Sequence, residues 1–133
     1  MSDSILIIDD DPLVGVVVEA YLYELGCPIQ LHSDSLTAME VIKRKKPSLV
    51  LLDLCMPGID GLTLCRQLKA DPQTRDIRIV AISGGAKDAD RRAALEQGAE
   101  AFIKKPFDGD SFPKEIAEIL SRPRLPPSGE KRS

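Results

Sequence analysis

The chain has 133 residues, and its composition of 43% hydrophobic and 29% charged residues predicts one globular domain rather than a disordered segment or two ordinary domains. No apolar run approaches the roughly 20 residues that a membrane span needs, and no basic, cleavable leader is evident, so we expect no membrane insertion and a cytoplasmic location. The net charge of −3 excludes a whole-chain attraction to nucleic acid, and we expect no direct nucleic-acid binding.

Short apolar runs alternate with amphipathic stretches five times along the chain. The apolar runs predict strands at residues 5–8, 29–32, 49–52, 77–82 and 101–103. Helical spacing predicts helices over 12–25 and 35–46, a third helix with Leu64, Cys65 and Leu68, a fourth that Gly98 closes, and a fifth with Phe112, Ile116, Ile119 and Leu120 on one side. The fourth helix is poor in large apolar residues, so we expect it to pack shallowly.

The first predicted helix has clear signals at both ends. Asp11 is well placed to cap it and Pro12 suits its first turn, whereas Gly26 is a natural stop. Pro47 ends the second predicted helix.

The alternating order of the elements predicts an α/β fold. Strands that are apolar throughout are typical of a parallel sheet with helices on both faces. Right-handed crossovers then give a doubly wound, five-stranded arrangement. In such sheets the functional site lies beyond the carboxyl ends of the strands.

The last residues differ in composition from the rest. Segment 122–133 is Pro-rich and carries four basic groups and one acidic group, a net +3, which leaves −6 on residues 1–121. This contrast predicts a domain over 1–121 and a disordered tail or linker over 122–133.

Three cysteines, Cys27, Cys55 and Cys65, occur without any C-x-x-C spacing. Their odd number and their separation favour neither a disulfide framework nor a zinc site. We therefore expect small buried thiols in a reducing compartment, with Cys65 packed in the core.

Four of the five predicted strands deliver polar or charged residues to one edge: Asp9 and Asp10, Asp53, Ser83 and Lys105. Carboxylates crowded at one edge repel each other and need a cation, and oxygen ligands in an open site favour Mg²⁺. Lys105 and Ser83 add a positive charge and a hydroxyl donor, which suit an anion. A cation, a lysine and a hydroxyl around one carboxylate are what phosphoryl transfer to an aspartate needs.

Four segments at these strand ends resemble the receiver domain of two-component response regulators, in its single-domain, chemotaxis-regulator-like form. They are 7–11 (IIDDD), 52–61 (LDLCMPGIDG), 82–84 (ISG) and 102–107 (FIKKPF). The likeness runs from residue 4 to about residue 121, in order and with matching spacings. It implies a flavodoxin-like sheet of strand order 2-1-3-4-5, a topology for which a receiver is itself a standard example.

The resemblance implies a metal-assisted phosphoacceptor site. Asp53 would accept the phosphoryl group. Asp10 would coordinate Mg²⁺ directly, Asp9 would do so directly or through water, and the backbone carbonyl of Cys55 would complete the protein ligands, together with Asp53 itself.

The resemblance also implies a switch. Lys105 would bind the phosphoryl oxygens, with a cis bond between Lys105 and Pro106, while Ser83 would move to hydrogen-bond the phosphoryl group and Phe102 would change rotamer with it. The implied partners are a histidine kinase or phosphotransfer protein, and a downstream protein target that binds the face formed by helix 4, strand 5 and helix 5. The chain would be a signalling protein and not an enzyme, catalysing only its own aspartyl phosphorylation and dephosphorylation.

Two other functions use the same residues. A phosphatase of the haloacid-dehalogenase type would use Asp9 as its nucleophile, but Leu13 stands where that class has Thr or Val, and no cap domain fits the length. A pseudo-receiver would bind partners without phosphorylation, although every acid, the hydroxyl and the lysine are present. Strand-end aspartates also serve as helix caps, and Phe102 as plain core. The sequence identifies neither the kinase nor the target, and it leaves open whether the protein acts alone or as part of a longer chain.

Overall fold

The computed structural model describes residues 3–84 and 88–123. Parallel strands form one five-stranded sheet in the order β2-β1-β3-β4-β5. The strands are β1 (Ile5–Ile8), β2 (Ile29–His32), β3 (Leu49–Asp53), β4 (Arg78–Ser83) and β5 (Ala101–Lys104). The α-helices are α1 (Pro12–Tyr21), α2 (Ala38–Lys45), α3 (Gly61–Ala70), α4 (Asp88–Glu96) and α5 (Ser111–Ser121). The predicted fold class and the implied strand order are both confirmed.

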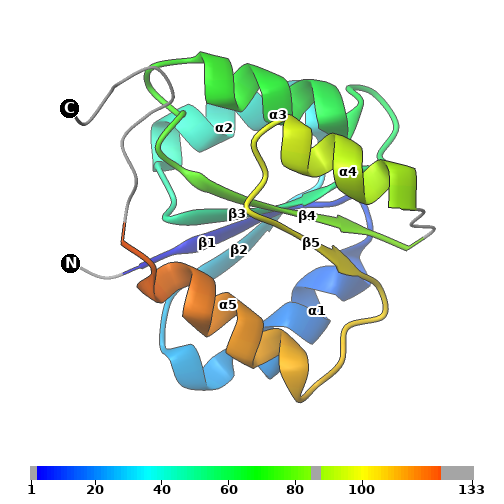
Figure 1. The fold of residues 1–133 in the computed structure, drawn as a ribbon. Helices are drawn as coiled ribbons and strands as arrows, with labels where there is room; N and C mark the ends of the chain where they lie inside the picture. Colours follow the sequence, from blue (N-terminus) through cyan, green and yellow to red (C-terminus); the bar gives the residue numbers. More distant parts are fainter. Residues whose placement is uncertain (1–2, 85–87, 124–133) are drawn as a thin grey trace.

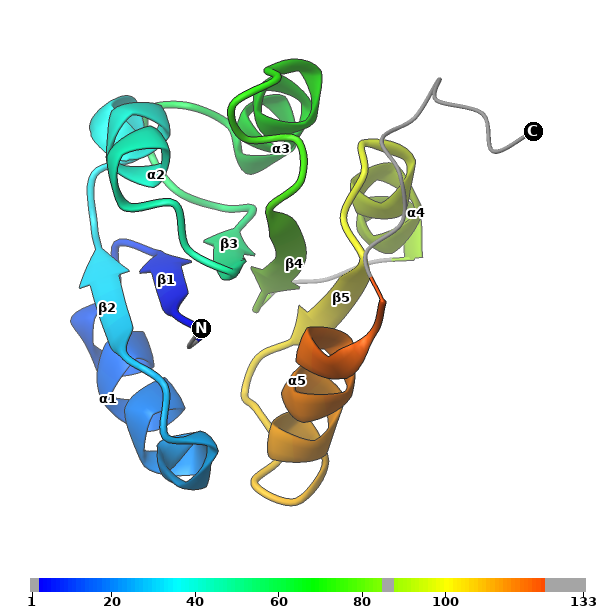
Figure 2. The ribbon, with the colours of Figure 1, turned by 90° about the vertical axis from the view of Figure 1, so that its left-hand side faces the viewer.

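Helices cover both faces of the sheet (Figures 1 and 2). α1 and α5 lie on one face, and α2, α3 and α4 lie on the other. Successive residues of β1 point to opposite faces, so Ile5 and Ile7 pack with α1 and α5, whereas Leu6 and Ile8 pack with α2 and α3. Since both faces are covered, β1 and β3 are buried along their whole length, which explains their continuous apolar sequence.

The first two helices are shorter than predicted because 3₁₀ turns take up part of each predicted range. α1 ends at Tyr21 and a 3₁₀ helix (Tyr23–Leu25) continues to Gly26, which has a φ of 71°. In the second predicted helix, residues Ser35–Thr37 form a 3₁₀ helix before α2 begins. Asp11 caps α1 as predicted, since its Oδ1 accepts a hydrogen bond of 3.0 Å from the Leu13 amide.

The last two helices pack as their sequences indicate. α5 buries Phe112, Ile116 and Ile119 against the sheet. In α4, Ala94 is fully buried, but Leu95 stays 41% exposed. α4 therefore contributes little apolar surface to the core, as expected of a shallowly packed element.

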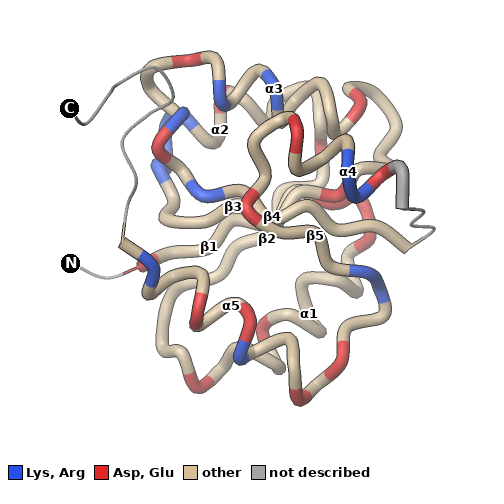
Figure 3. The backbone as a smooth tube through the Cα atoms, viewed as in Figure 1, with Lys and Arg blue, Asp and Glu red and all other residues tan. Residues whose placement is uncertain are grey.

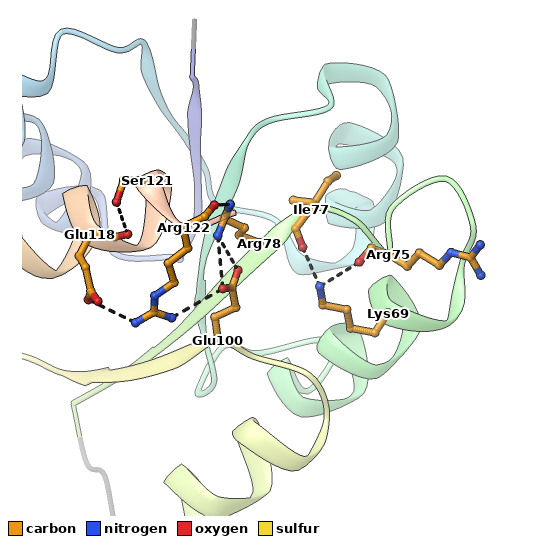
Figure 4. Close-up of polar contacts among 8 residues, drawn as sticks. All are labelled: Lys69, Arg75, Ile77, Arg78, Glu100, Glu118, Ser121 and Arg122. Atoms are coloured by element: carbon orange, nitrogen blue, oxygen red, sulfur yellow. Dashed lines mark hydrogen bonds and ion pairs between the residues drawn. The ribbon is translucent and has the colours of Figure 1, made fainter. Parts of the chain in front are cut away.

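A buried arginine joins the start of β4 to the end of α5 (Figure 4). Arg78 is 6% exposed; its guanidinium donates to the backbone carbonyl of Arg122 and lies 3.5 Å from Glu100. The Arg122 side chain pairs in turn with Glu100 at 3.8 Å and with Glu118 at 3.2 Å. Arg122, which we assigned to the tail, thus contacts the body of the domain, whereas residues 124–133 lie outside the described residues.

Basic and acidic residues are interspersed over the helices on both faces of the sheet (Figure 3). No helix in the two described ranges is long and apolar enough to cross a bilayer.

Candidate functional site

The sheet register brings the predicted site residues to one edge. Asp9 and Asp10 follow β1 directly, Asp53 is the last residue of β3, Ser83 is the last residue of β4, and Lys105 follows β5. Because all the strands run parallel, their carboxyl ends meet at the same edge. The spatial convergence predicted from the sequence is therefore observed.

Three carboxylates and one ammonium group meet at this edge. Carboxylate oxygens of Asp9, Asp10 and Asp53 all lie within 4.8 Å of one another. Lys105 Nζ lies 2.8 Å from Asp9 Oδ2 and 3.7 Å from Asp53 Oδ2. The bond between Lys105 and Pro106 is cis, as the resemblance implies.

The three acids differ in burial and in their partners. Asp9 is fully buried and Asp53 is 4% exposed, whereas Asp10 faces solvent. Asp9 Oδ2 forms an ion pair with Lys105 but accepts no aligned hydrogen bond within the described part of the chain. A buried carboxylate oxygen with unused lone pairs, flanked by two more carboxylates, fits a hard divalent cation. The residues present are thus compatible with Mg²⁺.

Comparison with known proteins agrees with this geometry. The profile of the response regulator receiver domain matches residues 5–117. The chain belongs to this family. It is 41% identical over 108 residues to the response regulator PleD of Caulobacter vibrioides, a match that covers 81% of the chain and 24% of PleD. The chain spans about half the length of several other curated relatives.

Solved receiver domains have the same fold. The BeF₃-activated receiver domain of Klebsiella pneumoniae RstA is 34% identical, with a TM-score of 0.81 over 90% of this chain and all of that one. The receiver domain of the sensor histidine kinase PA1611 of Pseudomonas aeruginosa is 29% identical, with a TM-score of 0.74 over 90% of this chain and 95% of that one. The PA1611 receiver holds a magnesium ion in its active-site cleft.

The pKa of Asp53 in this receiver domain is raised above its ordinary value. Burial is the main cause, because a desolvated carboxylate is less stable in its charged form, and the negative charge of Asp9 acts in the same direction. A hydrogen bond of 3.1 Å from the Cys55 amide to Asp53 Oδ1 and the charge of Lys105 oppose this rise without cancelling it. Burial also lowers the pKa of Lys105, but the neighbouring carboxylates outweigh this effect and raise it above its ordinary value.

The raised pKa of Asp53 predicts a pH-dependent effect of the Asp53→Asn substitution. The folded state binds the Asp53 proton more tightly than the unfolded state, so stability falls as the pH rises from 3.8, the ordinary value, through the raised folded pKa. Asparagine removes this loss. In metal-free buffer, Asp53→Asn should therefore raise Tm at neutral pH, and the gain should shrink at a pH well below 3.8. Thermal unfolding of the wild type and the variant, from below pH 3.8 to neutral pH, measures the difference in Tm. A difference in Tm that does not change with pH would contradict the prediction.

The side chains of Ser83 and Phe102 are both buried. Ser83 is 1% exposed, and its Oγ lies 3.6 Å from the Cys55 Sγ. Phe102 is 7% exposed and packs in the core on the side of α2, α3 and α4. In this state neither side chain is at the surface, so each would have to move to change the surface of the receiver domain.

The expectation of buried thiols is correct only in part. Cys65 is buried, and burial raises its pKa to about 11. Cys27 is half-buried, and Cys55 is exposed. The prediction is wrong for Cys55 because this residue lies in the loop after β3, where Leu54 and Met56 are buried on either side of it and its own side chain stays accessible to solvent.

One polar residue beside the site was missed by sequence reasoning. Ser35 donates a hydrogen bond of 2.8 Å to the Pro57 carbonyl and accepts one of 3.0 Å from the Ile59 amide. These contacts join the start of the second predicted helix to the loop that follows Asp53. A serine at a helix start reads as a cap, and nothing in the sequence indicates a partner 22 residues away.

Proposed function

We propose that Asp53 accepts a phosphoryl group from a histidine kinase or phosphotransfer protein in a Mg²⁺-dependent reaction. The single observation that carries this proposal is the convergence of Asp53 with Asp9, Asp10 and Lys105 at one edge of the sheet. A nucleophilic carboxylate needs opposite charge around it while a phosphoryl group approaches. The membership in the receiver family supports the assignment.

The proposed chemistry follows from the contacts of Asp53. The Cys55 amide fixes Oδ1 by a hydrogen bond, and Oδ2 faces Lys105. A carboxylate oxygen attacks the phosphorus atom, the bond from phosphorus to the donor nitrogen breaks, and its electron pair stays on the donor. Lys105 binds the phosphoryl oxygens, and the Ser83 hydroxyl donates a hydrogen bond to them. Mg²⁺, held by Asp9, Asp10, Asp53 and the Cys55 carbonyl, would neutralise the negative charge that gathers on those oxygens.

An apolar groove beside Lys105 suits a phosphodonor protein. The groove has a volume of about 490 Å³ and lies between α1 and the loop after β5. Its lining includes Leu13, which is 67% exposed, Tyr21, which is 38% exposed, and Phe107. Exposed apolar surface of this kind is typical of protein contacts. A donor seated here would present its phosphoryl group at Lys105.

The output is a change in the surface of the domain. Ser83 reorients toward the phosphoryl group and Phe102 changes rotamer, which alters the face formed by α4, β5 and α5 where the downstream target binds. The shallow packing of α4, with Leu95 41% exposed, supports a low cost for such a shift. Moving a two-state equilibrium from 1:99 to 99:1 requires about 5.5 kcal/mol of differential stabilisation.

The protein would act in the cytoplasm, where its three free cysteines stay reduced, and would catalyse only its own phosphorylation and dephosphorylation.

Intact-mass measurement with a small-molecule phosphodonor and Mg²⁺ tests the proposal. The wild-type chain should gain the mass of one phosphoryl group, and Asp53→Asn should gain none. Chelation of Mg²⁺ should prevent the gain. Asp60→Asn, which changes an exposed acid in the same loop, serves as the control and should be modified like the wild type. Modification of Asp9 instead of Asp53 would support the phosphatase, and no modification at all would support a pseudo-receiver.

A further inference from the structure

We propose that Ser35 is a positioning residue for the loop between β3 and α3, and that its hydroxyl sets the Mg²⁺ affinity of the site. The inference rests on the proposed function, because it concerns the loop that would supply the Cys55 carbonyl to the metal. The hydrogen bonds of the Ser35 hydroxyl go to the backbone of the loop and not to the acids of the site. It acts through the backbone of residues 57–59.

The Ser35 hydroxyl bridges the two sides of the turn at Gly58. It donates to the carbonyl of Pro57 and accepts from the amide of Ile59, so both backbone groups are held by one side chain. Ser35 is only 3% exposed, so the protein shields its side chain from solvent although Pro57 and Gly58 are themselves exposed. Without it, the two backbone groups would lose buried partners, and the turn would gain freedom.

Gly58 and Ser35 fit one another. Gly58 has a φ of +96°, a conformation that side chains rarely adopt. A Cβ at this position would lie 2.4 Å from Ser35 Oγ. The space that the missing Cβ leaves is therefore the space in which the Ser35 hydroxyl makes its two hydrogen bonds.

The bridge is close enough in sequence to control the metal ligand. Cys55 is separated from Pro57 by Met56, whose side chain is 7% exposed and packs in the core. Upstream, the Leu54 amide donates to the Ile82 carbonyl at 3.0 Å, which ties the loop to β4. The backbone of Cys55 thus lies between two fixed points, and Ser35 provides the second. Residues that hold a metal ligand in place are commonly worth about 10-fold or more in metal affinity.

Direct Mg²⁺ titration of the full chain, without any phosphodonor, tests this role. Amide NMR signals of residues 53–56 and 58–60 would report the Kd for Mg²⁺, and hydrogen exchange at the Ile59 amide would report the bridge. Ser35→Ala and Ser35→Gly, two variants without the hydroxyl, should bind Mg²⁺ about 10-fold more weakly and exchange the Ile59 amide faster. Ser35→Thr, which keeps a hydroxyl, should restore slow exchange and the wild-type Kd.

Asp34→Ala is the matched control. Asp34 caps the same 3₁₀ helix by accepting a hydrogen bond of 3.0 Å from the Leu36 amide, so its loss loosens this turn without removing the bridge to the loop. Its Kd for Mg²⁺ should stay at the wild-type value. A wild-type Kd in Ser35→Ala or Ser35→Gly, with the variant folded, overturns the inference. An equal loss of Mg²⁺ affinity in Asp34→Ala also overturns it. So does a Ser35→Thr chain in which the Ile59 amide exchanges slowly but Mg²⁺ binds weakly. If the wild type binds Mg²⁺ but takes no phosphoryl group, the proposed function fails. The Mg²⁺ affinities of the Ser35 variants still decide this inference in that case.

Discussion

Phosphoryl acceptance at Asp53 should slow by about 100-fold when Lys105 is replaced by methionine. The ammonium lies 3.7 Å from Asp53 Oδ2, where the oxygens of an incoming phosphoryl group would meet its charge. Methionine keeps most of the side-chain length and removes the charge, so the local fold should persist. The rate of phosphate incorporation from a small-molecule donor, followed by intact mass, measures the change.

The same variant should bind Mg²⁺ more tightly than the wild type. In the wild type the ammonium lies 2.8 Å from Asp9 Oδ2 and competes with a metal for this oxygen. Lys104→Met is the matched control, because Lys104 is the preceding residue and is exposed. Equal slowing in the two variants, or a wild-type rate in Lys105→Met, would show that the charge of Lys105 has no role at the phosphoacceptor.

Gly61→Ala should lower the free energy of unfolding by about 2 kcal/mol or more. A Cβ on Gly61 would lie 2.6 Å from Leu54 Cα and 2.7 Å from the Asp53 carbonyl oxygen. Both are backbone atoms at the end of β3, so the strand or α3 must shift. Alanine is the better helix former by up to about 1 kcal/mol, which offsets only part of the strain. Urea denaturation with the m-value held in common measures the loss.

Gly84→Ala separates the clash at Gly61 from a general effect of replacing glycine. A Cβ on Gly84 meets no atom of the described residues within 4 Å, and Gly84 does not have a positive φ. This control should be as stable as the wild type or slightly more stable. Phosphoryl acceptance should also fall in Gly61→Ala, since the displaced backbone includes Asp53. A Gly61→Ala chain with wild-type stability would mean that the end of β3 can move at no cost.

The architecture could be predicted because it depends on patterns that are local in sequence. Continuous apolar runs mark buried parallel strands, and the residue that follows each run marks its carboxyl end. Asp53 and Ser83 therefore identify the edge of the sheet from the sequence alone. The identity of these residues then limits the chemistry, because crowded carboxylates need a cation, and a carboxylate beside a cation and a lysine can accept a phosphoryl group.

Features that depend on pairing across long stretches of sequence could not be predicted in this way. The hydroxyl of Ser35 meets a carbonyl 22 residues away, and Arg78 reaches the carbonyl of Arg122, 44 residues away. An arginine at the start of an apolar run carries no sign that it will be buried with an ion-pair partner. The exposure of Cys55 was missed for a similar reason, since the direction of a loop side chain is set by the neighbours that anchor the loop.

The contacts of Arg78 with Arg122 and Glu100 also fix the place where the chain leaves the domain. α5 has 11 residues and runs antiparallel to the strands. It therefore carries the chain about 16 Å back from the sheet edge that holds Asp53 to the opposite end of the domain. There the backbone carbonyl of Arg122 accepts a hydrogen bond from Arg78, and the Arg122 side chain forms ion pairs with Glu100 and Glu118. The chain therefore leaves the described domain at the end remote from Asp53, so a phosphorylation signal would have to cross the body of the domain to reach this attachment point.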